Sequence, residues 1–344
     1  MNPISKTALK FLMYLLVHSN VLSQQDSIIP EKAIGNLLDI GGWKLHYNYV
    51  KATNQNSPTI IFESGIRGFS FEWIPIQQKL TSIANSFAYD RSGYAWSQLG
   101  PKPHTLKQTV YNLHTLLRKA GLKPPYILVG ASHGGMVARL FTQTYPEEVM
   151  GLVLVDAAYE DGVQYINGKK TYASLNAGGK KIPEVKTQAD DTDNNLARTQ
   201  EAITAIGGAL KSMGFPFKSV EHPFNMLPDS IQKLRLWALN QFEFYVANEN
   251  EYILDEKVEI IRERKKTPFM FSDKPLIVLT ATSSGNPNDP DEIDRLKNQS
   301  EMTNLSKNSK QIVINDSGHH IHVEKPDIII EAIKMIIGGL KQER

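Results

Sequence analysis

Short apolar runs alternate with helical patterns along most of this chain of 344 residues. Strands that alternate with helices indicate an α/β domain with a parallel sheet. The run at residues 151–157 is apolar on both faces, which is typical of a strand buried inside such a sheet. The predicted strands are residues 58–64, 86–90, 126–130, 151–157, 275–281 and 311–316, and the predicted helices are residues 71–82, 106–120, 134–145, 290–306 and 326–340.

A predicted hairpin at residues 36–50, with a Gly-Gly turn, adds two strands before this series. After the sixth strand the alternation breaks. Residues 160–270 consist of polar loops and helical stretches, of which residues 229–247 and 251–265 are the clearest. We therefore expect a signal segment at residues 1–23, a first core segment at 24–158, a helical cap or lid inserted at 159–272, and a second core segment at 273–344.

The first 23 residues have the pattern of a secretory signal peptide. Two lysines precede the apolar residues 11–17, and Val21 and Ser23 suit the −3 and −1 positions of a cleavage site. The apolar part is shorter than the roughly 20 residues that a membrane span needs. We therefore expect an exported protein, periplasmic or secreted, that is cleaved near Ser23 and has no stable membrane insertion after cleavage.

Composition excludes several classes of site and partner. The net charge is +2, which is too mild to indicate binding to nucleic acid or to an anionic membrane surface. The chain has no cysteine, so it has no disulfide, no thiolate zinc site and no cysteine nucleophile. No motif in the chain indicates a cofactor.

The glycine-rich sequence at residues 130–134 reads Gly-Ala-Ser-His-Gly and fits the pattern G-x-S-x-G. It lies between a predicted strand and a predicted helix, where a sharp turn holds the central serine in a strained conformation that requires small neighbours. The amide groups at the start of the following helix point toward a developing oxyanion. An ordinary glycine-rich turn would fit the same five residues, but the strand before it and the helix after it favour Ser132 as a nucleophile.

A histidine after the last predicted strand can supply the base for Ser132. His319 follows Gly318 on a loop, and the order of serine first and histidine last is the order that this architecture requires. His320 and His322 lie beside it, but imidazoles on one loop rarely converge on a metal, and no carboxylate is spaced to complete a ligand set. We therefore expect no metal at this position.

Five sequence blocks in this order resemble the serine hydrolases of the α/β-hydrolase fold. The blocks are FESGIRGFSFEW, AYDRSGYAWS, YILVGASHGG, GLVLVDAAYED and SGHHIH. The resemblance implies that Ser132 is the nucleophile, that His319 is the general base, and that the backbone N–H groups of Ile66 and His133 form the oxyanion hole. Asp90, Arg91 and Gly93 in the second block are interpreted as structural. Many members have His-Gly where this chain has Ser64-Gly65, so a side-chain role at position 64 does not transfer.

The triad acid is the open question of the sequence. In most members it lies a few residues past the strand that corresponds to residues 275–281, where the first carboxylates here are Asp289 and Asp291. Asp156, at the end of the strand at 151–157, is the alternative, and it needs no loop excursion to reach His319. We favour Asp156, although an aspartate at that strand end could also only brace the cap junction. The role of Glu63, near the proposed oxyanion loop, stays open.

A serine nucleophile favours acyl transfer to water from a small to medium-sized carboxylic ester, through an acyl-enzyme. A peptidase, of the aminopeptidase type, or an acyltransferase would use the same triad, and a non-catalytic binding protein could retain the fold. Aromatic residues of the insertion could line an apolar substrate pocket, or they could only join the cap to the core. These residues are Trp237, Phe242, Phe244, Tyr245 and Tyr252. The oligomeric state is not indicated.

Overall fold

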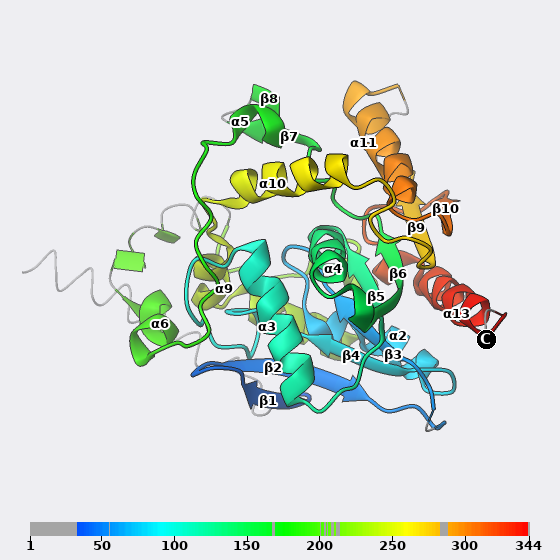
Figure 1. Cartoon of the computed structure of the whole chain (residues 1–344). Coiled ribbons are helices and arrows are strands. Elements are labelled where there is room, and N and C mark those ends of the chain that lie inside the picture. Colours follow the sequence, from blue (N-terminus) through cyan, green and yellow to red (C-terminus); the bar gives the residue numbers. More distant parts are fainter. Residues whose placement is uncertain are drawn as a thin grey trace, which may run out of the picture.

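The computed structural model describes residues 33–342, except residues 55, 167–168, 200, 203, 205, 208–209, 211–213 and 283–287 (Figure 1). The signal peptide expected at residues 1–23 lies outside the described residues. Within the described part of the chain, no helix is both long enough and apolar enough to cross a membrane.

An eight-stranded sheet forms the centre of the molecule, in the order β1-β2-β4-β3-β5-β6-β9-β10. β2 runs antiparallel to both β1 and β4, and the other neighbours are parallel. This arrangement confirms the predicted α/β class with a mostly parallel sheet. The strands are β1 (Asn36–Asp39), β2 (Lys44–Val50), β3 (Thr59–Glu63), β4 (Asn85–Tyr89), β5 (Tyr126–Ala131), β6 (Val149–Val155), β9 (Leu276–Ala281) and β10 (Ser309–Ile314).

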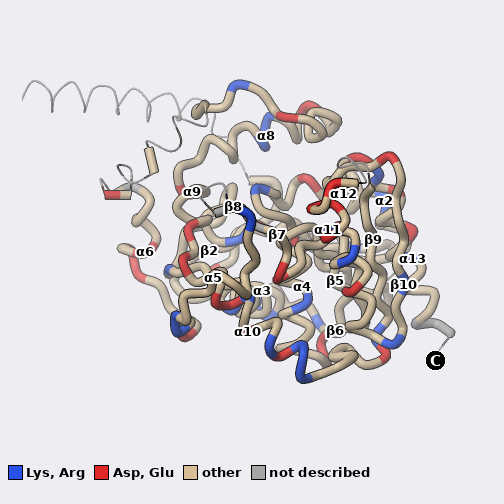
Figure 2. The backbone as a smooth tube through the Cα atoms, turned by 90° about the horizontal axis from the view of Figure 1, so that it is seen from above, with Lys and Arg blue, Asp and Glu red and all other residues tan. Residues whose placement is uncertain are grey.

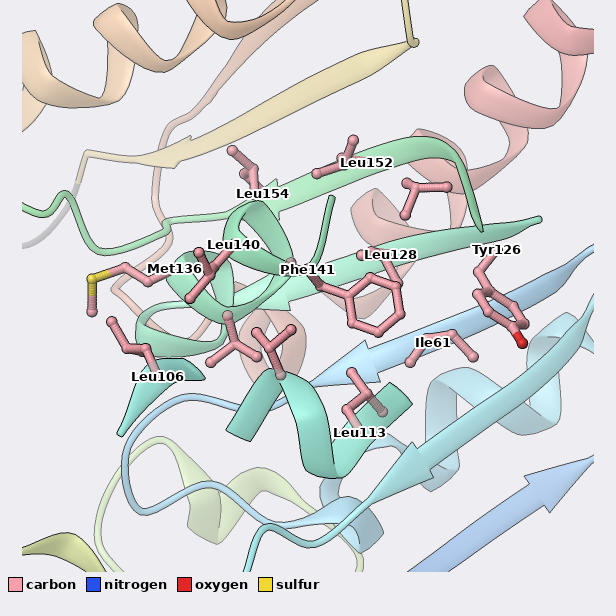
Figure 3. Close-up of a cluster of buried hydrophobic side chains, with 14 of the residues drawn as sticks. Ile61, Leu106, Leu113, Tyr126, Leu128, Met136, Leu140, Phe141, Leu152 and Leu154 are labelled. Carbon is pink, nitrogen blue, oxygen red and sulfur yellow. The ribbon is translucent and has the colours of Figure 1, made fainter. Parts of the chain in front are cut away.

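Helices cover both faces of this sheet. The helices of the two core segments are α2 (Ile74–Leu80), α3 (Leu106–Lys119), α4 (His133–Thr144), α11 (Pro290–Glu301), α12 (Ile321–Glu324) and α13 (Pro326–Gln342). The side chains of β6 alternate between two apolar clusters: Leu152 belongs to the cluster that includes α3 and α4, and Val153 belongs to the cluster that includes α2 and α13. Figure 3 shows the first cluster, where Leu128, Leu152 and Phe141 meet between strands and helices. Since both faces of β6 are buried, its run of apolar residues is continuous.

The segment between β6 and β9 lies outside the main sheet. It contains α8 (Asp229–Leu239), α9 (Phe242–Asn248) and α10 (Ile253–Lys266), together with the short helices α5 (Ala173–Asn176) and α6 (Asp191–Asn195). It also contains a two-stranded hairpin of β7 (Val163–Ile166) and β8 (Lys169–Tyr172), which the sequence patterns did not predict. In the view of Figure 2, basic and acidic residues are interspersed over the molecule.

The prediction of one helix over residues 229–247 is wrong. The chain breaks between α8 and α9 at Asn240, whose side chain accepts a hydrogen bond from Phe217 N and donates one to Phe217 O. The same side chain donates to Leu236 O, four residues earlier, and so competes with the backbone N–H that would continue the helix. The break thus lies at a residue whose side chain bonds both to its own helix end and to the Phe217 backbone, and the local pattern does not contain the second contact.

Candidate active site

The candidate site lies where the strand order of the sheet reverses. From β3 the chain continues to β4 on one side, and from β5 it continues to β6 on the other side, while β3 and β5 are neighbours. The carboxyl ends of two such strands form a crevice, which is the usual ligand site of an open α/β sheet. The Ser64–Gly65 loop follows β3 and Ser132 follows β5, so both segments lie at this crevice.

The backbone at Ser132 has the strained turn that the motif predicts. Its φ of 50° and ψ of −122° lie outside the regions that side-chain-bearing residues prefer. Two hydrogen bonds hold it there: Ser132 N donates to Val155 O over 3.1 Å, and Ala158 N donates to Ser132 O over 2.9 Å. The turn is therefore fixed against the end of β6.

Steric contacts explain the glycines around Ser132. A Cβ atom added at Gly130 would lie 2.5 Å from Gly134 O, and one at Gly134 would lie 2.2 Å from Glu63 O. A Cβ atom at Gly135 would lie 2.3 Å from the Cβ of Ala157. No side chain fits at these distances, so the close approach of helix α4 to the strands requires glycine at all three positions.

The loop after β3 approaches the Ser132 side chain closely. A Cβ atom added at Gly65 would lie 3.1 Å from Ser132 Cβ and 3.7 Å from Ser132 Oγ. Arg91 holds this loop, because its Nη1 donates to Ser64 O and its Nη2 donates to Gly65 O, both over 2.6 Å. The C=O and N–H groups of a trans peptide point in opposite directions, so the N–H of Ile66 points away from Arg91.

Glu63 binds two side chains that the sequence did not identify as its partners. Arg91 Nη1 donates to Glu63 Oε1 over 2.7 Å, and Tyr89 Oη donates to Glu63 Oε2 over 2.5 Å. Burial raises the pKa of the Glu63 carboxyl above its usual 4.5, and its contacts with Arg91 and Tyr89 oppose that shift. This buried group positions Arg91 beneath the Ser64–Gly65 loop, which agrees with the structural interpretation of Arg91.

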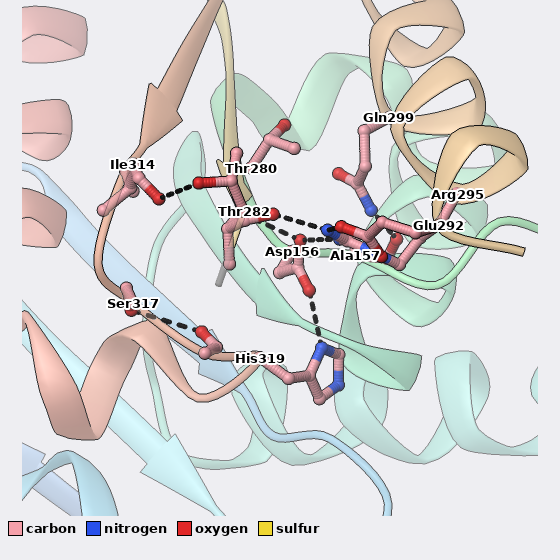
Figure 4. Close-up of polar contacts among 12 residues, drawn as sticks. Asp156, Ala157, Thr280, Thr282, Glu292, Arg295, Gln299, Ile314, Ser317 and His319 are labelled. Atoms are coloured by element: carbon pink, nitrogen blue, oxygen red, sulfur yellow. Dashed lines mark hydrogen bonds and ion pairs between the residues drawn. The ribbon is translucent and has the colours of Figure 1, made fainter. Parts of the chain in front are cut away.

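The His319 ring pairs with Asp156. His319 Nδ1 lies 2.7 Å from Asp156 Oδ2, while the other ring nitrogen points away from the carboxylate (Figure 4). The second oxygen, Asp156 Oδ1, accepts from Ala281 N over 3.1 Å and from Arg295 Nη1 over 2.6 Å. Asp156 is buried and has a φ of 40°. The carboxylate is thus held on three sides and presents one oxygen to the imidazole.

The two alternative carboxylates have other contacts. Asp289 is exposed and caps helix α11, since its Oδ1 accepts from Asp291 N over 3.0 Å. Asp291 forms an ion pair with Lys170 Nζ at 2.5 Å. Of the three candidate acids, Asp156 alone forms a hydrogen bond with His319 among the contacts described.

The neighbouring histidines of the loop pack against aromatic rings. The His320 ring lies 4.5 Å from Phe224, and the His322 ring stacks on Trp73 at 4.8 Å, centroid to centroid. Burial lowers the pKa of His320 to about 3, and the Coulombic effects of His322, His319 and Arg235 lower it further. The three histidine rings of this loop therefore have different surroundings.

Two cavities open at the site. The first, of about 280 Å³, is lined by Ser132, His133 and Ile66, and the second by Asp156 and His319. Ala158 and Lys257 line both, so the cavities adjoin at these two residues. Ser132 Oγ and the His319 ring form no hydrogen bond within the described residues. The structure thus places Ser132 at the first cavity and His319 at the second, and Ala158 and Lys257 lie at both.

Comparison with known families decides the assignment. Residues 58–326 match the model of the α/β hydrolase fold. The chain belongs to the α/β-hydrolase fold family. The match extends over both core segments and the insertion between them.

Relatives of this hydrolase-fold chain include two Bacillus subtilis (strain 168) proteins that are named uncharacterised. YqjL is 32% identical over 122 residues, which are 36% of this chain and 47% of the relative. YbdG is 25% identical over 169 residues, which are 48% of this chain and 50% of the relative. The chain therefore spans about half the length of these relatives.

Solved structures with the same fold are more distant in sequence. An esterase from Thermogutta terrifontis has a TM-score of 0.61 at 18% identity, with 89% of this chain and 99% of that chain covered. An enol-lactonase from Burkholderia xenovorans LB400 has a TM-score of 0.58 at 14% identity, with 88% and 100% covered. At these identities the similarity shows the fold.

The aromatic residues of the insertion pack against the core, which is the second of the two alternatives that the sequence left open. Trp237 and Phe244 are buried in a third apolar cluster with Phe69 and Tyr94 of the core, and Phe242 and Tyr245 pack against it. None of the five lines either cavity among the described residues. The residues that α9, α10 and the turn between them contribute are instead Ala247, Asn248, Asn250, Ile253 and Lys257.

Sequence reasoning missed two residues near the site, Arg295 and Lys257. Arg295 lies on the predicted helix at 290–306. Its position after a strand end indicates only weakly that it pairs with a carboxylate. Lys257 lies among several charged residues of α10, and nothing in the local pattern separates it from its neighbours. The contact of Arg295 with Asp156 and the position of Lys257 at the two cavities both depend on how the helices pack.

Proposed function

We propose that the protein is a serine hydrolase that cleaves a carboxylic ester through an acyl-enzyme, with Ser132, His319 and Asp156 as its triad. The observation that carries the proposal is the contact of His319 Nδ1 with Asp156 Oδ2 at 2.7 Å, at the sheet edge where Ser132 occupies the strained turn. Such a carboxylate fixes the tautomer of the imidazole and stabilises the imidazolium that forms during the reaction.

In the proposed reaction, Ser132 Oγ attacks the carbonyl carbon of the ester while His319 Nε2 takes the hydroxyl proton. The carbonyl oxygen becomes an oxyanion, which the N–H groups of Ile66 and His133 stabilise. Collapse of this intermediate breaks the ester bond, and the leaving alcohol takes the proton from His319. Water then attacks the acyl-enzyme with His319 again as the base, which releases the acid and restores Ser132.

The hydrogen bond between Ser132 Oγ and His319 is expected to form in the complex with substrate. Catalytic hydrogen bonds are often long before substrate binds and tighten in the Michaelis complex. A group bound at the wall shared by the two cavities would lie between the nucleophile and the base.

Labelling with a fluorophosphonate probe tests this proposal. We expect folded wild-type protein to be labelled, S132A to be unlabelled, and S92A to be labelled. Ser92 is a matched control because it lines the same cavity away from the turn. Absence of label on folded wild type, or label retained in S132A, would contradict the proposal. Turnover of p-nitrophenyl esters compared with aminoacyl arylamides would then distinguish an esterase from a peptidase.

A further inference from the structure

The charges that line the cavity at Ser132 are unbalanced. Its basic lining residues are Arg91, His104, His133 and Lys257, and the described lining residues include no Asp or Glu. Arg91 is neutralised by Glu63 at 2.7 Å. Lys257 forms no hydrogen bond and no ion pair within the described residues. Among the described lining residues, Lys257 is therefore a cation whose ammonium group no carboxylate contacts directly.

The two histidines of this cavity add no second charge. His104 Nδ1 lies 3.1 Å from Ala247 O, so this nitrogen carries the proton, and Nε2 is buried without a partner. Burial lowers the pKa of His104 to about 4. Burial also lowers the pKa of His133 well below its usual 6.5, and the cations Arg91, Lys257 and Arg139 lower it further. Both rings are therefore neutral near pH 7.

Acidic residues near Lys257 are already engaged. Glu160 is buried and accepts hydrogen bonds from Arg139 and Arg264, so one carboxylate serves two guanidinium groups. The Asp161 carboxylate is bound by the backbone N–H and the hydroxyl of Ser174. Burial lowers the pKa of the Lys257 ammonium below its usual 10.5, and the Coulombic attraction of Glu160 and Asp161 opposes that shift without cancelling it. A cation in a half-buried position gains most from an anion that arrives with the ligand.

We infer that Lys257 binds a carboxylate on the substrate, so that the preferred esters carry an anionic group close to the scissile bond. The inference rests on the proposed function and names its substrate class. Because Lys257 lines both cavities, this carboxylate can belong to the acyl part or to the alcohol part of the ester. An ammonium–carboxylate contact in such a place is charge-assisted and stronger than one between neutral groups.

Matched pairs of esters test the inference and separate the two positions. Monoethyl glutarate compared with ethyl pentanoate places the charge in the acyl part, and 4-acetoxybenzoate compared with 4-acetoxybenzamide places it in the alcohol part. We expect wild type to have a higher kcat/KM for the anionic member of at least one pair. K257M should lower that value by about ten- to one-hundredfold, as expected for a lost hydrogen bond to a charged group. Its kcat/KM for neutral esters should stay within about twofold, and K257R should retain the preference.

K266M is the matched control, since Lys266 is exposed on the same helix and pairs with Glu263. It should leave kcat/KM unchanged for both the anionic and the neutral esters. No preference in wild type for either anionic ester, or an equal loss in K257M for charged and neutral esters, would overturn the inference. If K257M does not fold, competitive inhibition of wild type by glutarate but not by glutaramide supports the inference, and equal inhibition contradicts it. Binding of glutarate to S132A, measured by calorimetry, tests the contact with Lys257 without any ester turnover. The fluorophosphonate labelling of wild type tests the proposed function separately.

Discussion

Two acidic segments follow the neighbouring strands β6 and β9: residues 156–160 and residues 289–292. In the first, Asp156 and Glu160 are both buried, and each carboxylate binds side chains from distant parts of the chain. In the second, Asp289 is exposed and bonds to its own helix. Asp156 and Glu160 thus act over long range, whereas Asp289 acts locally.

Local chain geometry explains this difference. Asp156 follows the last residue of β6 directly, and its positive φ of 40° keeps it at the strand end, where its N–H donates to Leu279 O of β9 over 2.8 Å. Asp289 is eight positions past the end of β9 (281 to 289), next to helix α11, where an acidic side chain satisfies the free amides of the first turn. Because Asp156 is held directly at the strand end, its carboxylate reaches only groups that pack against that end of the sheet.

Removing the charge of Asp156 has the largest expected effect. D156N should lower kcat by about three to four orders of magnitude, because an amide cannot stabilise the imidazolium or hold the correct tautomer. D289N is the matched control and should keep kcat within about twofold, since asparagine also caps helices well. Ester turnover with correction for the folded fraction checks both. A large loss in D289N with an active D156N would reverse the assignment of the acid.

Glu160 gives the second prediction, on stability. E160Q should lower the free energy of unfolding by about 3–5 kcal/mol, because it removes one charge from a buried cluster with two arginines. Interactions with Arg139 and Arg264 outweigh burial and hold the pKa of Glu160 at about 2, below its usual 4.5. A lowered carboxyl pKa stabilises the fold above the unfolded value, and the stabilisation is lost as pH falls toward the folded value.

Urea unfolding at several pH values measures this effect. The difference between wild type and E160Q should be constant above about pH 5.5 and should shrink as the pH falls from about 4.5 toward 2. The matched control is E249Q, because Glu249 is exposed and pairs with Lys102; it should change stability by less than about 1 kcal/mol. An E160Q difference that does not depend on pH would show that the Glu160 charge contributes nothing.

The smallest expected effect is at Asp289. D289A should lower the free energy of unfolding by about 1 kcal/mol, through loss of the cap of α11. The specific activity of the folded protein should not change, because Asp289 forms its described contact within its own segment. Thermal unfolding together with ester turnover measures both. A loss of activity without a loss of stability would contradict the local role assigned to Asp289.

The sequence determined the fold class and the turn at Ser132. Both follow from local chemistry: buried parallel strands require continuous apolar runs, and the approach of α4 to β3 and β5 requires the glycines at 130 and 134. The position of His319 after the last strand also follows from chain order. The break at Asn240 and the β7–β8 hairpin were missed, because they depend on contacts within a polar insertion with weak periodicity.

Tertiary structure alone decided how the charged groups pair. The sequence favoured Asp156 over Asp289 and Asp291 from its place at a strand end, but it did not exclude the other two. The packing of β6 and β9 brings Asp156 to His319, and the packing of α11 places Arg295 at its other oxygen. The same holds for Lys257, which α10 places between the two cavities. Electrostatic interactions depend on distance and burial in three dimensions, and residue spacing along a chain of this length does not contain that information.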